Sequence, residues 1–430
     1  MTTIQENQEI APLIAESRLD NRRLVSIDVW RGVAALSVVA LHVPHYAHGG
    51  WRENPCFFLA FLADYGYFGV PFFVIISGFC IHRRAALQKF KTGTHHLRWT
   101  QFWVRRIWRL YPTYLAAIAF SLMCEFCFRA PANPALTATW VPDLFWHLIL
   151  AHNLTSDYAM TLGNGAFWSL GMEEQLYMLY FLLFLLLKRG TTVATVMVVA
   201  FFSILWRIAL PFLDQGTISL GFVRMGAWHL WPFNYWLHWT LGAIAIDAYM
   251  GNVTLSPCFR SVRLALFLIF AGLLIHPNAF ELIAHSKVGR GLFGELSIIP
   301  GRSFAAIFWV AELIWAVAFF CVINWGLDRE ARGGFRGSIS RALAYIGTLS
   351  YSLYLVHVPV LRIFQHHFPF GNSPRDWILR YAVYVPTTLA VGFVFYHCVE
   401  RWFLTTPQIL LSAHLERWQR PATSGNVRGV

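Results

Sequence analysis

The chain of 430 residues is 57% hydrophobic and only 13% charged, whereas soluble domains usually carry about 25% charged residues. This composition excludes an ordinary soluble enzyme, and apolar segments of about 20 residues recur along the chain, long enough to cross a bilayer. The formal net charge of +12 comes from basic residues at segment ends, which favours contact with anionic membrane lipid over nucleic-acid binding.

The sequence predicts one membrane domain between two tails. Residues 1–24 are polar and lack the basic start and short apolar core of a cleaved signal, so we expect a cytoplasmic N-terminal tail. No Gly/Ser-rich or Pro-rich linker divides residues 25–404, which form the integral membrane domain. Residues 405–430 are expected to be a cytoplasmic C-terminal tail.

Ten membrane-spanning helices are predicted, which makes the chain an all-α polytopic membrane protein. A shorter apolar stretch at 140–154 is expected to be a re-entrant or interfacial helix. Lys and Arg gather in the loop after the second span, and the positive-inside rule then places both termini in the cytoplasm. The ten spans are expected near 30–48, 66–82, 103–128, 166–187, 191–213, 228–249, 262–277, 304–326, 343–363 and 379–400.

The first span contains two ionisable residues, Arg31 and His42. They are 11 residues apart, about three helical turns, so they share one helix face. His42 lies about 17 Å of helix rise from the cytoplasmic end, and an ionisable side chain inside a membrane is a functional candidate. A histidine bonded to a carbonyl freed by Pro44 is the alternative. His45 and His48 continue this face without a matching carboxylate or cysteine cluster, so no metal site is predicted.

Two arginines, Arg106 and Arg109, begin the third span. They stand at i and i+3 and therefore share one helix face. Arginines at this spacing form a fork for phosphate oxygens. A snorkelling pair that binds lipid headgroups is the alternative, and the spacing alone leaves both possibilities open.

Two carboxylates, Glu173 and Glu174, lie side by side near the outer end of the fourth span. Glu173 is about 10 Å below the outer surface, at a depth similar to that of His42. A histidine and a carboxylate at one depth can act as a base and its orienting partner. The alternative, that the carboxylates favour the positive end of the helix dipole, suits Glu174 better. Phosphate-binding charge inside and acid–base chemistry towards the outside fit acyl-coenzyme A as donor.

Several stretches resemble motifs of the membrane acyltransferase-3 family: IDVWRGVAALSVVALH, FGVPFFVIISGFCI, RRIWRLYP, FWSLGMEEQLYMLY and LSYSLYLVHVPV, in chain order. The resemblance extends from about residue 24 to 403. It implies a multi-pass enzyme of the inner or plasma membrane that moves an acyl group from cytoplasmic acyl-coenzyme A, with acetyl-coenzyme A favoured. The implied acceptor is a sugar hydroxyl of an extracytoplasmic glycan or a glycolipid.

The resemblance also assigns roles to individual residues. Val29 and Trp30 depart from the family pattern before Arg31, and Trp402 stands where many members have proline, so Glu400 is not placed in the catalytic set. The implied catalytic residues are His42 and Glu173, the donor-binding residues are Arg31, Arg106 and Arg109, and the substrate-binding residues are Trp168, Tyr177 and, by a looser match, His357.

Two other functions remain open at this stage. Some members of the family acylate macrolides and other small molecules, so the acceptor could be a small molecule. A proton-coupled transporter or flippase, with a relay through His42 and Glu173, belongs to a different class. No internal repeat pairing two broken helices supports that reading. The sequence predicts no oligomeric state.

Overall fold

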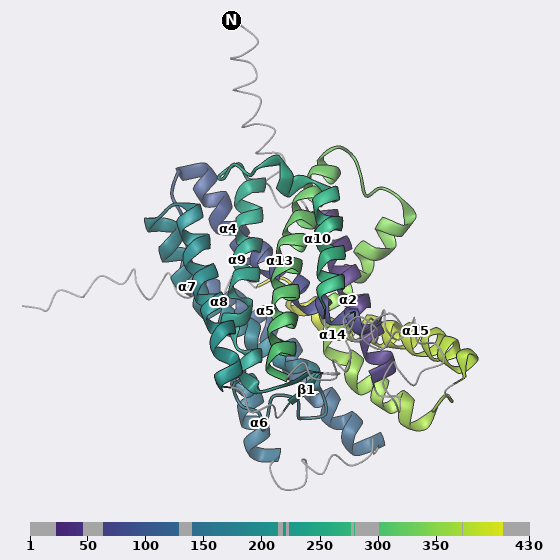
Figure 1. The fold of residues 1–430 in the computed structure, drawn as a ribbon. Coiled ribbons are helices and arrows are strands. Elements are labelled where there is room, and N and C mark those ends of the chain that lie inside the picture. The colour runs from purple at the N-terminus through teal and green to yellow at the C-terminus, as the bar shows by residue number, and fades with distance from the viewer. Residues whose placement is uncertain are drawn as a thin grey trace, which may run out of the picture.

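The computed structural model describes residues 23–45, 63–128, 140–213, 218–220, 223–276, 279, 301–371 and 373–406. Each of the ten predicted spans corresponds to a helix, which confirms an all-α membrane fold (Figure 1). The helices are α2 (Val25–His45), α4 (Gly69–Thr92), α5 (Trp99–Phe128), α7 (Trp168–Arg189), α8 (Thr192–Leu213), α9 (Pro232–Tyr249), α10 (Val262–Ile275), α13 (Gly301–Ala331), α14 (Ser338–His367) and α15 (Pro374–Cys398).

Eight helices of the described chain are long and apolar enough to cross a membrane. Ten spans were predicted, and the two that do not meet this criterion are α9 and α10. Helix α10 is apolar but has only 14 residues. Helix α9 has 18 residues, is buried over most of its length, and carries Asn234, His238 and Asp247, which lower its hydropathy. The predicted tails lie almost wholly outside the described residues, as does His48.

Short elements join the long helices at one end of the bundle. The predicted helix near 140–154 is α6 (Trp140–Leu148), followed by a 3-10 turn, His152–Leu154. Strands β1 (Ile218–Leu220) and β2 (Val223–Met225) form an antiparallel hairpin, a small exception to the all-α prediction. In Figure 1, α6 and β1 lie at the same end of the molecule.

Glycines set how closely the helices approach. A Cβ atom at Gly242 of α9 would lie 1.9 Å from the carbonyl oxygen of Ile75 in α4, and one at Gly78 would lie 2.0 Å from that of Trp239. These distances are too short for any side chain, so glycine is required where α4 crosses α9. Close backbone approach through small residues is how helices pack in membranes, where lipid is as apolar as the side chains.

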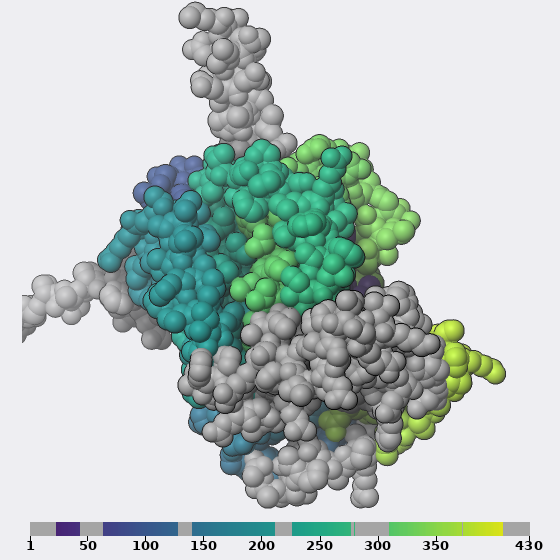
Figure 2. Space-filling model, in the orientation of Figure 1, coloured from purple at the N-terminus to yellow at the C-terminus, as the bar shows by residue number. Residues whose placement is uncertain are grey.

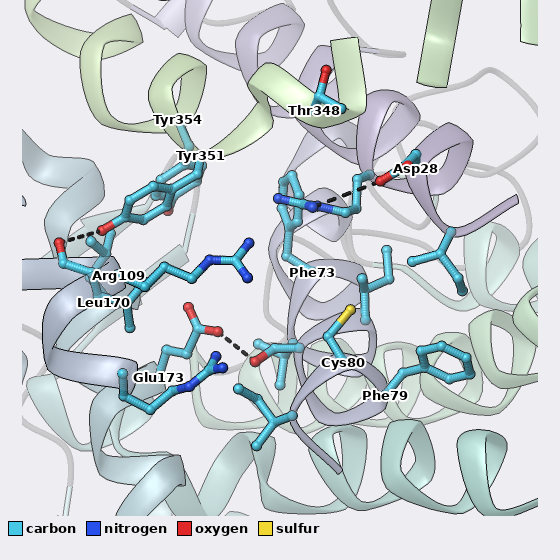
Figure 3. Close-up of a pocket in the computed structure, with 18 of the residues that line it drawn as sticks. Asp28, Phe73, Phe79, Cys80, Arg109, Leu170, Glu173, Thr348, Tyr351 and Tyr354 are labelled. Carbon is cyan, nitrogen blue, oxygen red and sulfur yellow. Dashed lines mark hydrogen bonds and ion pairs between the residues drawn. The ribbon is translucent and has the colours of Figure 1, made fainter. Parts of the chain in front are cut away.

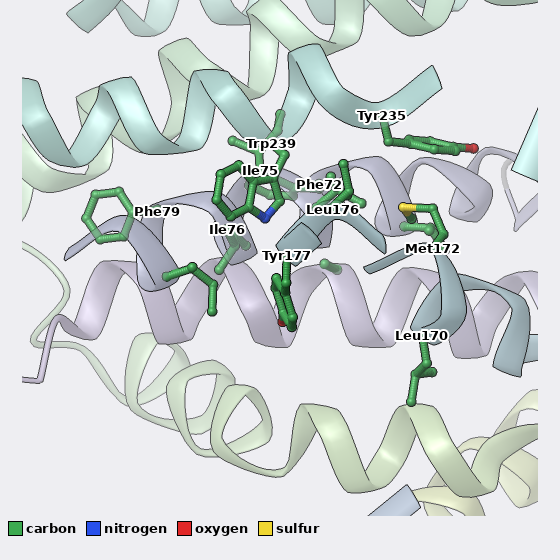
Figure 4. Close-up of a cluster of buried hydrophobic side chains, with 14 of the residues drawn as sticks. Phe72, Ile75, Ile76, Phe79, Leu170, Met172, Leu176, Tyr177, Tyr235 and Trp239 are labelled. Atoms are coloured by element: carbon green, nitrogen blue, oxygen red, sulfur yellow. The ribbon is translucent and has the colours of Figure 1, made fainter. Parts of the chain in front are cut away.

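The core lies where α4, α7 and α9 meet (Figure 4). Ile75, Met172 and Trp239 are fully buried there. The Trp239 ring lies 5.0 Å from that of Tyr180, in an edge-to-face arrangement. Helices α8 and α10 instead lie on the outer surface seen in Figure 2, where large apolar side chains such as Phe201 and Phe267 are exposed. An apolar outer face is what a lipid environment requires.

Candidate active site

A cavity of about 560 Å³ opens between α2, α4, α5, α7 and α14. Among the described residues, its lining carries five arginines and three carboxylates. A cavity with excess positive charge and low-dielectric walls attracts anions. The arginines are Arg23, Arg31, Arg83, Arg106 and Arg109, and the carboxylates are Asp28, Glu173 and Glu400.

Arg106 and Arg109 reach the cavity from α5, one helical turn apart. Figure 3 shows Arg109 pointing into the space between Tyr351 and Glu173. Neither arginine forms a hydrogen bond or ion pair with a described residue, and Nε of Arg106 is buried without a partner. The Arg106 guanidinium lies 6.0 Å from the ring of Phe102. Two half-buried guanidinium groups without a protein partner can bind an anionic ligand.

Arg31 lies in the same cavity, on the first half of α2. Its Nη1 lies 3.9 Å from Oδ1 of Asp28, which is labelled in Figure 3. Asp28 also pairs with Arg23. Asp28 therefore neutralises part of the positive charge at this wall, while the α5 arginines keep theirs.

Glu173 projects into the cavity from α7. One of its oxygens, Oε1, accepts hydrogen bonds from the Ser77 hydroxyl at 2.5 Å and the Tyr177 hydroxyl at 2.6 Å. The predicted pairing with His42 is therefore not observed. Equal depth in the membrane fixes only one coordinate of a side chain, and the packing of α4 against α7 supplies Ser77 as the partner. Tyr177, predicted to bind substrate, lines the cavity and holds Glu173.

His42 instead contacts His357, from α14. The two ring centroids are 4.8 Å apart, edge to face. Nδ1 of His42 lies 2.8 Å from the carbonyl oxygen of Val38, and Nδ1 of His357 lies 2.6 Å from that of Tyr354. Because a carbonyl only accepts, each Nδ1 must carry the proton, and each neutral ring then has its lone pair on Nε2.

The histidine pair lies beyond one wall of the cavity. His42 and His357 do not line it, but Tyr354 does, one helical turn before His357. The rings of Tyr354 and His357 are 5.4 Å apart, and the Tyr354 hydroxyl lies 2.6 Å from the Ser169 hydroxyl. Trp168, the remaining predicted substrate residue, is buried outside the lining, with its ring 6.0 Å from that of Tyr235.

Glu400 is an acidic residue of the cavity that was not predicted from the sequence. This residue begins the 3-10 helix Glu400–Phe403, directly after α15. Its Oε2 accepts hydrogen bonds from the backbone N–H of Ser352 at 3.0 Å and from the Ser352 hydroxyl at 2.5 Å. Burial raises the pKa of the Glu400 carboxyl. The departure at Trp402 removed Glu400 from consideration, although an acid beside the last span was a visible signal.

The helices and the cavity define a multi-pass membrane protein built around a basic internal site. The chain belongs to the acyltransferase 3 family, because the family model described as an acyltransferase domain matches residues 24–397. No solved structure matches the chain.

Curated relatives resemble the chain at low identity. The peptidoglycan O-acetyltransferase OatA of Listeria monocytogenes is 25% identical over 170 residues, which cover 38% of this chain and 24% of that protein. The O-acetyltransferase OatA of Staphylococcus aureus is 21% identical over 398 residues, which cover 90% of this chain and 58% of that protein. The match therefore spans about a quarter of the Listeria protein and little more than half of the Staphylococcus protein.

Proposed function

We propose that the protein is a membrane O-acyltransferase that moves an acyl group, with acetyl favoured, from cytoplasmic acyl-coenzyme A to a sugar hydroxyl of an extracytoplasmic or lipid-linked glycan. Family membership and the names of the two relatives support acyl transfer, and the name of the Listeria protein supports a glycan as the acceptor. The observation that carries the proposal is the pair Arg106 and Arg109, which lack partners among the described residues and line a cavity of about 560 Å³. A volume of this size is typical of cavities that bind small molecules.

In this proposal the arginines hold the phosphates of the donor. Coenzyme A carries its phosphates at one end of a long thin arm and the thioester at the other. Arg106 and Arg109 would bind phosphate oxygens, and Arg31 would add charge from α2. Glu173, fixed by Ser77 and Tyr177, would repel a misplaced phosphate and keep the two hydroxyls oriented along the wall.

His42 is proposed as the general base. Its Nε2 would take the proton of the acceptor hydroxyl as that oxygen attacks the thioester carbonyl carbon. The carbon–sulfur bond then breaks, and the proton passes from the imidazolium to the leaving thiolate. The hydrogen bond from Nδ1 to the Val38 carbonyl supports this role, because it orients the ring and makes Nε2 the nitrogen that would accept a proton. His357 would limit the rotation of the His42 ring.

The proposal also fixes a direction across the membrane. The basic ends of the helices would face the cytoplasm and anionic lipid of the inner or plasma membrane. The acyl arm would extend from the arginines past Tyr354 towards His42, and the acceptor would approach from the other side.

Sealed vesicles of known orientation test this function. With labelled acetyl-coenzyme A supplied at the cytoplasmic face and glycan at the opposite face, we expect acylated glycan at the glycan's face while the coenzyme stays on its own side. Product formed only when both substrates are cytoplasmic would favour a small-molecule acyltransferase. If the purified protein neither transfers nor hydrolyses the thioester but moves protons or solutes across the membrane, the transporter alternative would replace the proposal.

A further inference from the structure

Three buried side chains converge on the face of α4 opposite the cavity. His82 belongs to α4, His95 to the loop before α5, and Asp247 to α9, and their ligand atoms all lie within 4.8 Å of one another. Nε2 of His82 is 3.3 Å from Oδ2 of Asp247, and Nε2 of His95 is 3.9 Å from the same oxygen. Cys80 and Arg83 line the donor cavity but His82 does not. The cluster is therefore a site distinct from the donor cavity.

His95 is the unusual member of the cluster. Its exposed fraction is 5%, yet neither ring nitrogen has a hydrogen-bond partner of ordinary geometry among the described residues. Buried polar atoms without partners are rare in folded proteins and require an explanation. Burial lowers the pKa of His95 to about 4, so the ring is neutral near pH 7, which is the form that coordinates metals.

Outer contacts orient the other two side chains. Nδ1 of His82 lies 2.9 Å from the Tyr180 hydroxyl, which leaves Nε2 pointing towards Asp247. Oδ1 of Asp247 accepts a hydrogen bond from the Asn252 amide at 2.9 Å, which leaves Oδ2 facing the histidines. Hydrogen bonds from the far side of each ligand are characteristic of metal centres, where they fix ring orientation and tautomer.

We infer that His82, His95 and Asp247 bind a divalent transition-metal ion, with zinc the best match to two imidazole nitrogens and one carboxylate oxygen. In a tetrahedral zinc site the ligand atoms lie about 3.4 Å apart. The distance of 3.3 Å between His82 and Asp247 matches this value. His95 lies farther away, at 3.9 Å, and the loop at 93–98 that carries it has no regular secondary structure and can move closer. Water would complete the coordination.

The ion would tie together α4, which lines the donor cavity, the loop that leads into α5, and α9, which packs against α4. Asp247 fixes the end of α9, His82 fixes α4 beside Arg83, and His95 fixes the loop that leads into α5 and its two arginines. The site would thus hold the basic wall in place without touching the donor. Its ligands are separated by 13 and 152 positions along the sequence, so no local motif reveals it, and the sequence analysis predicted no metal.

Metal content of the full-length protein tests the inference independently of acyl transfer. The protein is purified in detergent through a tag without histidines, loaded with zinc, desalted and measured by mass spectrometry. We expect about one zinc per chain in the wild type. His95→Ala should reduce the zinc content at least about tenfold at matched free zinc. His96→Ala is the matched control, because His96 is the adjacent, exposed histidine, and it should retain the wild-type content.

Cobalt gives a second measurement on the unaltered chain. Loading with Co²⁺ should produce the visible absorption of a tetrahedral site in the wild type and in His96→Ala. Asp247→Asn, which keeps the side-chain volume, should lose that absorption if His95→Ala proves too unstable to purify. Zinc content equal in the wild type and His95→Ala, or a wild type that binds neither ion, would overturn the inference.

Discussion

Arginines lie in two regions of the helical bundle, and their partners differ. Arg207 of α8 is buried and paired through both terminal nitrogens: Nη1 lies 2.7 Å from Oε2 of Glu312 in α13, and Nη2 lies 2.6 Å from the carbonyl oxygen of Asn234. Arg106 and Arg109 of α5 face a cavity and have no such partner among the described residues. An intramembrane guanidinium that forms an ion pair with a neighbouring helix holds the helices together, whereas one without an ion pair beside a cavity is available to a ligand.

The paired region is also closed to water. Glu312 is completely buried, the Tyr67 hydroxyl donates to its Oε1 at 3.1 Å, and the ring of Trp309 lies 5.0 Å from the Arg207 guanidinium. The contrast predicts that substitutions in this region change stability, whereas substitutions at the cavity and the histidine pair change binding or turnover.

The largest effect on turnover is expected at His42. His42→Ala should lower kcat by about 10²–10⁴-fold, the usual loss of a general base, while unfolding in detergent stays near that of the wild type. Steady-state transfer and a denaturant titration measure the two quantities. His366→Ala, at the exposed end of α14, serves as the control. Near-normal turnover in His42→Ala would remove the residue from the catalytic role.

The largest effect on stability is expected at the paired region. Glu312→Ala leaves the Arg207 charge buried and alone, which should lower the free energy of unfolding by about 3–5 kcal/mol. Titration with sodium dodecyl sulfate in mixed micelles measures the shift. The double variant R207M/E312L should recover most of the loss, because apolar side chains of similar volume replace the whole pair. A Glu312→Ala protein as stable as the wild type would contradict the structural role.

At the cavity, the smaller effect should fall on donor binding. Arg106→Ala or Arg109→Ala should weaken acyl-coenzyme A binding by about 10–100-fold, the range for a lost hydrogen bond to a charged group. Stability should hardly change, and lysine should rescue only in part because it lacks the fork. Calorimetry with a non-hydrolysable donor analogue measures the affinity.

Arg105→Ala is the control for this measurement, since Arg105 lies on the same helix outside the cavity lining. Unchanged donor affinity in both cavity variants, together with weaker lipid binding, would favour the snorkelling alternative.

The smallest effect is expected at Glu400. This carboxyl is intermediate between the paired region and the unpaired arginines, because its hydrogen-bond donor is a serine and not an arginine. Burial raises its pKa above the ordinary value of 4.5, so the folded state prefers the protonated carboxyl. Stability from this group is therefore present below pH 4.5 and is lost as the pH rises through the folded pKa. Glu400→Gln stays neutral, so its melting temperature relative to the wild type should increase from pH 4.5 to pH 7. A constant difference across that range would show that Glu400 does not titrate as proposed.

Part of the site follows from helical periodicity. Arg106 and Arg109 share a face because three residues make nearly one turn, and this relation holds however α5 is packed. Both residues reach the cavity as their spacing predicts. Arg31 of α2 also reaches the cavity, but His42, predicted on the same helix face, does not line it. The partner of Glu173 does not follow, since Ser77 lies 96 positions away and only the packing of α4 against α7 brings it near.

The sequence by itself determined the helices and their number to within two, because a run of about 20 apolar residues must form a helix to satisfy its backbone hydrogen bonds in lipid. It also determined the family, through local motifs. The tertiary structure decided which polar groups meet: His42 with His357, Ser352 with Glu400, and His95 with Asp247. These contacts depend on which helices become neighbours. Close packing decides this at positions such as Gly78 and Gly242, where the backbones of two helices far apart in the sequence come into contact.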